Sequence, residues 1–472
     1  MELVVKVFLA PFLGALLSFA YSSTLGMPIA LLSFTMLFIL LHLTISSTGR
    51  FFVSFLFHAA FVIVQHSFLL PKIANDWAAI LLFIPLIGVF LPPSLSFFLQ
   101  KRRFIELYCV VLLLSTYLFS VSSVGNPLIE LWGIAGSIPW AIKWLQYTGP
   151  APISLWILLM AYFSYRNIIY RKPKGLLILL VFLPVGVSQV IKEPSNKERS
   201  FFNMALISFS DSTSRERDYY KILSGDFSQI DYLLLPEGAI YVNSNQKQVS
   251  PSITVLKRLT SRYSNMSVIA GVFSFDNEYM SNEAILLSES KNQVHYKRKL
   301  IPFVEYLPYK NLFGQMPFLA KRMLYPVKET SDENIDIFKG TRLPSIMPLI
   351  CYEGLFRSCY VEGVSNGCHA FLVLSSNSYL DGKRMEKTIT NFLRCYAIAM
   401  HRPIIRCVEH GISSFISDQG VIINHNSYKT EVLKQKIYYS GEDSFYGTQS
   451  NYMESVYFVF LLILCLFLCF SF

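Results

Sequence analysis

The sequence predicts a polytopic α-helical membrane bundle joined to an extracytoplasmic α/β domain. The prediction rests on composition, on the uneven spread of hydrophobic residues and on the placement of Lys and Arg in short loops. Of 472 residues, 53% are hydrophobic and only 15% are charged, which excludes an ordinary soluble enzyme. The apolar runs fall within 4–191 and 456–470. The mixed sequence between them is long enough to bury a core of its own.

The apolar runs predict about eight membrane-spanning helices. A spanning helix needs about 20 mostly apolar residues. The candidate ranges are 4–22, 27–45, 51–70, 77–98, 104–122, 151–167, 174–191 and 456–470. We do not expect the first run to be a cleaved signal peptide, because further spans follow it and no convincing small-x-small cleavage site appears.

Basic residues in the short loops predict the orientation. If the N-terminus is cytoplasmic, the outside loops hold only Lys72 and Lys143. The inside loops hold Lys6, Arg50, Lys101, Arg102, Arg103, Arg166, Arg171, Lys172 and Lys174. This positive-inside bias predicts that residues 193–454 face the periplasm or an equivalent space and that both termini are cytoplasmic. The net charge of +10 fits this topology and a membrane surface, and no nucleic-acid motif appears.

The segment between the apolar runs predicts an α/β domain. Apolar and alternating runs predict strands at 203–210, 231–241, 266–275, 283–289, 294–303, 346–350 and 369–379. Helical spacing follows at 385–402, and 402–425 predicts a strand, a turn and a hairpin. The predicted division is a membrane domain (1–192), an extracytoplasmic domain (193–454) and a C-terminal spanning helix (455–472).

Three polar residues stand at the ends of predicted apolar strands: Glu237, Lys297 and Cys351. Singly, each has an ordinary interpretation as a solvated turn carboxylate, a solvated or headgroup-bound lysine and a core cysteine. Strand ends are, however, where α/β folds present functional groups. Together the three residues supply a thiol nucleophile, a base and a cation for an oxyanion. A Cys–His pair using His401 or His410 is an alternative at this point.

The sequence predicts neither a metal nor a cofactor. It has no CxxC motif and no His/Cys cluster at the spacing of metal ligands. Of the cysteines in the outer segment, where disulfides can form, Cys359 and Cys368 could pair. Cys351 must stay reduced if it is a nucleophile.

The order of these residues resembles the nitrilase (carbon–nitrogen hydrolase) superfamily, and specifically its membrane branch, the apolipoprotein N-acyltransferases. The strings that carry the resemblance are Pro236-Glu237, "KRKLIPFVEYLP" (297–308), Cys351-Tyr352-Glu353, "HRPIIR" (401–406) and "GISSFISDQG" (411–420). The resemblance covers the whole chain, because this family also has eight spans with its catalytic domain outside, before the last span. It implies a nitrilase-like αββα sandwich for the outer domain.

The resemblance also implies roles for the site residues. Cys351 is the expected nucleophile, Glu237 the general base and Lys297 the oxyanion-stabilising group. Glu305, Tyr352 and Glu353 are expected to have supporting roles. For Glu305 and Glu353, a structural salt bridge with a nearby basic residue is an equal alternative. The implied reaction is ping-pong: a membrane phospholipid acylates Cys351 as a thioester, and the N-terminal diacylglyceryl-cysteine of a lipoprotein accepts the acyl group.

The chain departs from the family pattern around the expected pocket. Leu235 stands where a tryptophan commonly precedes Pro-Glu, and "SNSYL" (376–380) replaces the family's N-D-A-W-F. These departures leave two alternatives open. The same thiol chemistry could serve another amine or water, or the chain could be a non-catalytic membrane homologue, against which the retention of the three core residues argues.

Overall fold

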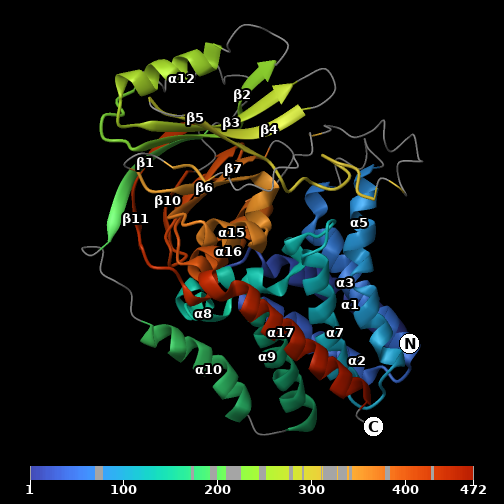
Figure 1. The fold of residues 1–472 in the computed structure, drawn as a ribbon. Coiled ribbons are helices and arrows are strands. Elements are labelled where there is room, and N and C mark those ends of the chain that lie inside the picture. Colours follow the sequence, from blue (N-terminus) through green and yellow to red (C-terminus); the bar gives the residue numbers. More distant parts are fainter. Residues whose placement is uncertain are drawn as a thin grey trace. The chain divides into compact units, whose positions relative to one another are not determined.

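The structure is a computed structural model that describes residues 2–69, 78–171, 175–191, 199–208, 225–243, 251–275, 280–289, 292–309, 311, 327, 337–339, 343–377, 383–426 and 430–470. The chain forms two compact units (Figure 1). Unit 1 contains Met1–Lys192, Arg384–Cys395 and Gln449–Phe472, and unit 2 contains Glu193–Lys383 and Tyr396–Thr448.

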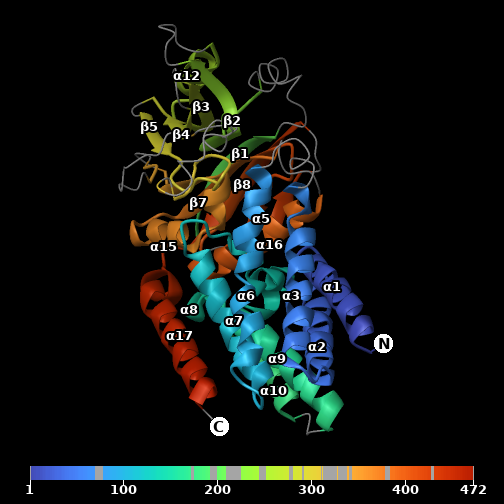
Figure 2. The ribbon, with the colours of Figure 1, turned by 90° about the vertical axis from the view of Figure 1, so that its right-hand side faces the viewer.

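Unit 1 has an apolar helix at every range where a span is predicted (Figure 2). The helices are α1 (Glu2–Ala20), α2 (Gly26–Leu43), α3 (Ser47–Gln65), α5 (Ala78–Gly88), α6 (Leu91–Leu95), α7 (Phe104–Ser120), α9 (Ala151–Tyr170), α10 (Gly175–Val190) and α17 (Phe445–Phe470). The predicted span at 77–98 is broken into α5 and α6, where Pro92 and Pro93 favour a new helix start. Among the described helices, α2, α3 and α17 are long and apolar enough to cross a membrane. The count of eight spans stays a prediction.

Glycine and buried polar pairs fix the packing of unit 1. A Cβ on Gly14 of α1 would lie 1.9 Å from the Phe57 carbonyl oxygen of α3, so only glycine permits this approach. His58 Nε2 lies 2.6 Å from the Tyr108 hydroxyl, and the hydroxyls of Ser54 and Ser94 are 3.0 Å apart. Small residues and polar pairs of this kind hold helices together where lipid removes the hydrophobic driving force.

The short helices between α7 and α9 also pack against part of a later helix. They are η3 (Pro127–Ile129), η4 (Leu131–Ser137), η5 (Pro139–Ala141) and α8 (Leu145–Thr148), and the later helix is α16 (Lys383–Met400). In unit 1, a Cβ on Gly136 would lie 2.1 Å from the Asn391 carbonyl oxygen. The Phe392 ring stands 4.4 Å from the Trp132 ring. Residues 384–395 of α16 are therefore part of the unit 1 core.

Unit 2 is built on two β-sheets (Figure 1). The six-stranded sheet has the order β11-β1-β2-β3-β4-β5, and the five-stranded sheet the order β10-β9-β8-β7-β6. The strands are β1 (Ser200–Ser208), β2 (Tyr232–Asn243), β3 (Ser267–Phe275), β4 (Met280–Leu287), β5 (Asn292–Tyr296), β6 (Ile346–Ile350), β7 (Ala370–Ser376), β8 (Ile404–Glu409), β9 (Ser414–Ile416), β10 (Ile422–His425) and β11 (Glu431–Tyr439). β1, β2 and β3 are parallel to one another, as are β6, β7 and β8.

The two sheets share one apolar core and carry helices on their outer faces. Residues of both sheets, such as Leu234 of β2 and Leu372 of β7, form one buried cluster. The opposite face of the six-stranded sheet packs against α12 (Pro251–Arg262). On the other side, Tyr360 of α15 (Arg357–Ser365) stacks on Tyr396 of α16 and contacts Phe371 of β7. The resulting layers are helix, sheet, sheet and helix, which confirms the α/β prediction for this part of the chain.

The prediction missed or misplaced several elements of unit 2. β5 ends at Tyr296, not at 303, because the chain turns at Lys297 to reach the site described below. The apolar pattern did not predict α12 or α15, nor β11, which alternates weakly and pairs with β1 across more than 200 residues of sequence.

Candidate active site

Glu237 lies on an irregularity inside β2. The pairing of β2 with β3 shifts between Leu235 and Ile240, and Gly238 has a φ of +64°. A bulge of this kind re-aims a side chain. The predicted strand over 231–241 is confirmed as β2 (Tyr232–Asn243), but Glu237 lies on a bulge inside this strand and not at its end, where the sequence had predicted it.

Gly271 of β3 makes room for the bulge. A Cβ there would lie 2.4 Å from the Glu237 Cα and 2.6 Å from the Pro236 carbonyl oxygen. Since both atoms belong to the backbone, neither can move without displacing Glu237. The close approach of the two strands needs a glycine at this position.

Gly271→Val is expected to lower activity with a moderate loss of stability. Overpacking a sheet in this way costs about 1–3 kcal/mol, and a shift of about 1 Å in a catalytic group can cost about 100-fold in rate. Acyl-enzyme formation and the thermal unfolding midpoint should be measured together. Gly367→Val is the control, because a Cβ there meets nothing within 4 Å; its φ of +75° brings backbone strain without touching the site. Wild-type rates in Gly271→Val would contradict the assigned packing.

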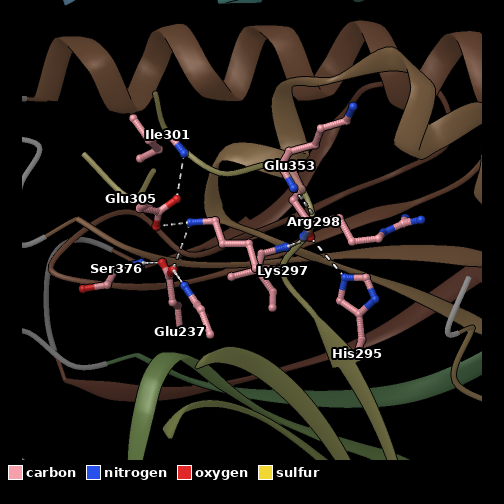
Figure 3. Close-up of polar contacts among 11 residues, drawn as sticks. Glu237, His295, Lys297, Arg298, Ile301, Glu305, Glu353 and Ser376 are labelled. Carbon is pink, nitrogen blue, oxygen red and sulfur yellow. Dashed lines mark hydrogen bonds and ion pairs between the residues drawn. The ribbon is translucent and has the colours of Figure 1, made fainter. Parts of the chain in front are cut away.

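The Glu237 carboxylate is buried and held from two sides (Figure 3). Its Oε1 accepts a hydrogen bond of 2.7 Å from the Asn282 amide of β4, and its Oε2 accepts one of 2.8 Å from the Ser376 backbone N–H at the end of β7. Burial raises the pKa of Glu237 above its ordinary value, although the charge of Lys297 and these hydrogen bonds oppose the rise. A carboxylate with a raised pKa is suited to accept a proton near neutral pH.

Lys297 is the buried cation of the site. It follows β5 directly, its backbone N–H donates to the Asn282 carbonyl at 2.9 Å, and its side chain is 1% exposed. Its Nζ lies 2.6 Å from Glu305 Oε1 and 3.7 Å from Glu237 Oε1. Burial alone would lower the pKa of Lys297, but the charges of Glu305 and Glu237 outweigh it and raise that pKa. The ammonium is therefore fixed and permanently charged.

Glu305 holds the lysine in place. Its Oε1 accepts from Lys297 Nζ, and its Oε2 accepts a 2.8 Å hydrogen bond from the Ile301 backbone N–H (Figure 3). The same turn is closed by the Glu305 N–H, which donates to the Ile301 carbonyl at 2.9 Å. Glu305 thus has a salt bridge to a basic residue, and that residue is itself part of the site.

Cys351 begins the short helix η7 (Cys351–Leu355) directly after β6. Its φ of +51° places a non-glycine residue in the left-handed region, a strained conformation that is concentrated at functional sites. Its thiol lies close enough to the Glu237 carboxylate for the two groups to interact electrostatically. Burial and then the charge of Glu237 raise the pKa of Cys351, while Lys297 opposes the rise. The resting sulfur is therefore a neutral thiol that needs a base.

Glu353 ties the lysine turn to the cysteine turn (Figure 3). Its Oε1 accepts a 2.7 Å hydrogen bond from the Arg298 N–H, and its Oε2 accepts one of 2.8 Å from the Ile350 N–H. His295 Nε2 lies 3.1 Å from the same Oε2, and both side chains are buried. Although burial opposes ionisation, His295 and these amides lower the pKa of Glu353 to about 2. Glu353 therefore stays charged at neutral pH and acts as a clamp between the two segments.

The clamp predicts a stability that is lost in acid. The lowered pKa of Glu353 stabilises the folded protein at pH values above about 4.5, the pKa of the unfolded chain. This stabilisation, up to about 3 kcal/mol, is lost as the pH falls towards about 2. The thermal unfolding midpoint should fall over this range in the wild type and fall less in Glu353→Gln, which starts lower. His295→Phe should lose part of the same dependence. Equal acid profiles for wild type and Glu353→Gln would contradict the assigned clamp.

The remaining predicted residues lie at the margin of this cluster. Tyr352 packs its ring edge-on to Phe356, with centroids 4.9 Å apart. His401 Nε2 lies 3.4 Å from Asp418, and His410 Nε2 lies 3.8 Å from Glu409. The group beside the thiol is thus Glu237, and the Cys–His alternative loses its support. All eight cysteines, including Cys359 and Cys368, are free thiols.

Asn282, Ser376, His295 and Gly271 were not predicted from the sequence. Asn282 carried no usable signal, because it lies between Ser281 and Glu283 in a polar stretch of β4. Gly271 had a usable signal, as a lone glycine within the strand "SVIAGVFSF". Ser376 acts through its backbone N–H, so its side chain carries no such signal.

The cluster can perform acyl transfer through sulfur. A thiol of raised pKa lies near a carboxylate of raised pKa, and a buried ammonium lies 3.7 Å from that carboxylate. These are the nucleophile, the base and the charge that such chemistry requires. The described residues contain no group of three or more His, Cys, Asp or Glu side chains that could hold a metal ion.

Comparisons with known proteins give one matching family and several similar proteins. Residues 219–440 match the family Carbon-nitrogen hydrolase. The chain is 23% identical over 404 residues to the apolipoprotein N-acyltransferase of Thermotoga maritima, covering 79% of this chain and 76% of the relative. It is 25% identical over 402 residues to that of Rickettsia typhi, covering 77% and 78%. Among solved structures, Saccharomyces cerevisiae Nit3, a nitrilase-superfamily member, aligns with a TM-score of 0.38 at 15% identity, covering 52% of this chain and 93% of Nit3.

Proposed function

We propose that this chain, whose residues 219–440 match the carbon–nitrogen hydrolases, is a membrane acyltransferase that N-acylates the N-terminal diacylglyceryl-cysteine of lipoproteins. The observation that carries the proposal is the buried Lys297 ammonium 3.7 Å from the Glu237 carboxylate, with the Cys351 thiol near enough for the charges of both to affect its pKa. The similarity to apolipoprotein N-acyltransferases over most of the chain supports the choice of substrate.

In the first half-reaction, a phospholipid donates its acyl chain. Cys351 Sγ attacks the ester carbonyl carbon as Glu237 accepts the thiol proton. The carbonyl oxygen becomes an oxyanion, whose charge the Lys297 ammonium stabilises. The carbon–oxygen bond then breaks, Glu237 returns the proton to the leaving oxygen, and a lysophospholipid departs. Cys351 remains acylated as a thioester.

In the second half-reaction, the amine of the lipoprotein takes the acyl chain. The neutral α-amino nitrogen attacks the thioester carbonyl, and Glu237 accepts the proton that the nitrogen loses. The carbon–sulfur bond breaks, and Glu237 returns this proton to Sγ. The products are an amide on the lipoprotein and the regenerated thiol, so one base serves both halves.

The proposed location is the bacterial cytoplasmic membrane. The apolar helices of unit 1 and the bacterial relatives support an inner-membrane protein. The distribution of Lys and Arg supports cytoplasmic termini and a catalytic domain of residues 193–454 that faces the periplasm. Both proposed substrates carry acyl chains, so an enzyme anchored by eight spans can meet them in the plane of the bilayer.

The test is a search for the acyl-enzyme. Purified full-length protein in detergent is incubated with a phospholipid that carries a tagged acyl chain. We expect label on the protein that neutral hydroxylamine removes, and no label on Cys351→Ala. Cys407→Ala is the matched control, because Cys407 is another free thiol of unit 2. Folded protein without label would overturn the proposal.

The acceptor is tested in a second step. A diacylated lipopeptide added to the labelled enzyme should remove the label and gain it as an amide. The same peptide with an acetylated N-terminus should leave the label in place. Release of free fatty acid at equal rates with and without the peptide would instead identify a hydrolase.

A further inference from the structure

Arg384 is a half-buried arginine of unit 1 that has no carboxylate partner in the described part of the chain. Its guanidinium donates to the Val64 carbonyl of α3 and lies 4.8 Å from the centre of the Phe19 ring. Burial lowers the pKa of Arg384, and no acid offsets that effect. By contrast, Arg298 is paired with Glu362 at 2.8 Å. A guanidinium has five N–H donors, and the hydrogen bond to Val64 is the one that the described residues give Arg384.

The end of α3 beside Arg384 has a second unsatisfied group. Gln65, next to Val64, is 1% exposed, and both its amide nitrogen and its amide oxygen lack a partner. The following residue, His66, is fully satisfied, through the Val62 carbonyl at 3.1 Å and the Asn126 amide at 3.2 Å. Buried polar side chains are seldom left unpaired, and such exceptions often mark a missing ion or ligand.

An exposed apolar stripe on α1 ends at the same place. Phe8, Phe12 and Phe19 are 75%, 64% and 48% exposed, and Phe19 carries the Arg384 guanidinium on its ring. The stripe from Phe8 to Phe19 is about 16 Å long at 1.5 Å per residue. One leaflet of the hydrocarbon core is about 15 Å thick. The length and polarity of this surface match one lipid with its chains on the phenylalanines and its headgroup at the arginine.

We propose that Arg384 binds the phosphodiester group of a membrane phospholipid whose acyl chains lie along Phe8, Phe12 and Phe19. A phosphodiester is an acceptor-only anion, so it suits the guanidinium donors and would supply a counter-charge that the described residues do not. This site depends on unit 1 lying in a membrane and does not depend on acyl transfer.

The experiment compares two lipids with identical chains, of which one has a phosphate. Full-length protein in detergent is mixed with phosphatidylglycerol or with monogalactosyl diacylglycerol, and retained lipid is counted by native mass spectrometry. Every sample carries Cys351→Ala, so that turnover does not consume lipid and the result stands apart from the acyl-enzyme assay. The parent protein is the one with Cys351→Ala alone. We expect it to retain phosphatidylglycerol about tenfold better than the variant that also carries Arg384→Gln, which corresponds to a loss of about 1.4 kcal/mol of binding free energy.

Matched variants decide the outcome. Arg384→Lys keeps the charge, so its retention of phosphatidylglycerol should lie between that of the parent and that of Arg384→Gln. Arg258→Gln removes an exposed arginine from α12 of unit 2 and should change nothing. The galactolipid should be retained equally by all variants. Equal phosphatidylglycerol retention by the parent and Arg384→Gln would overturn the proposal.

A final arm distinguishes a lipid from a free anion. Inorganic phosphate is added to delipidated protein, and thermal unfolding is followed. We expect no shift in the unfolding midpoint, because free phosphate cannot use the apolar stripe. A shift in the parent that Arg384→Gln lacks, with no preference between the two lipids, would assign the site to free phosphate and overturn the lipid assignment.

Discussion

Glu237→Gln is expected to lower the rate of acyl-enzyme formation by about 10²- to 10⁴-fold, the range for loss of a general base. The amide keeps the size of the side chain and can still bind the Ser376 N–H through its oxygen, but it cannot take the Cys351 proton. Because the resting sulfur is a thiol of raised pKa, little thiolate is available without the base. Label from a tagged phospholipid, followed in time, measures this rate.

The pH dependence of the same rate provides an independent check. Glu237 must be ionised to act, and its pKa is raised, so the wild-type rate should increase with pH through this raised pKa. In Glu237→Gln this increase of the rate with pH should disappear. The remaining rate should rise only at higher pH, where the Cys351 thiolate forms. Glu289→Gln, on an acid outside the cluster, is the control and should keep the wild-type profile. If the rate of Glu237→Gln increased with pH as it does in the wild type, the base would be another residue.

Lys297→Met is expected to lower both activity and stability. Loss of a charge that stabilises an oxyanion costs about 10²- to 10³-fold in rate. Glu305 and Glu237 would then share a buried site without their cation, and breaking a buried ion pair in this way costs about 3–5 kcal/mol. The rate of acyl-enzyme formation and the thermal unfolding midpoint should both be measured.

A double substitution separates the two effects of Lys297. Lys297→Met with Glu305→Gln removes the uncompensated charge at the position closest to the ammonium, so most of the stability should return. The rate should stay low, because the cation is still absent. Recovery of the rate along with the stability would contradict a direct role for the ammonium in catalysis.

The parts of the site that could be predicted are those with strong local signals. Glu237, Lys297 and Cys351 each stand at the end of a predicted apolar strand, and the order of their motifs along the chain links them. Asn282 and the Ser376 N–H could not be assigned in this way, because their role arises only where β4 and β7 meet the bulge of β2. The bulge itself depends on Gly271 in a neighbouring strand, a relation that periodicity along one strand does not contain.

The same distinction applies to the fold. Long apolar helices and buried strands such as 346–350 were predicted closely, because an element that is buried on all sides appears in the sequence as an uninterrupted run of apolar residues. β11 was missed because it is an edge strand with exposed lysines, paired with β1 at the other end of the domain sequence. The left-handed conformation of Cys351 was also outside prediction, since non-glycine residues adopt it only when tertiary contacts enforce it.

The division of α16 between two units has a consequence for how the protein is made. Residues 384–395 complete the core of unit 1, whereas the strands before and after them, β7 and β8, belong to unit 2. During synthesis, the helices of residues 1–192 must wait for a segment that leaves the ribosome about 190 residues later. The five-stranded sheet cannot close until α16 has been placed. Biogenesis of the two units is therefore interlocked, and a fragment of residues 193–454 would expose the side chains of Asn391 and Phe392 that its missing partner should cover.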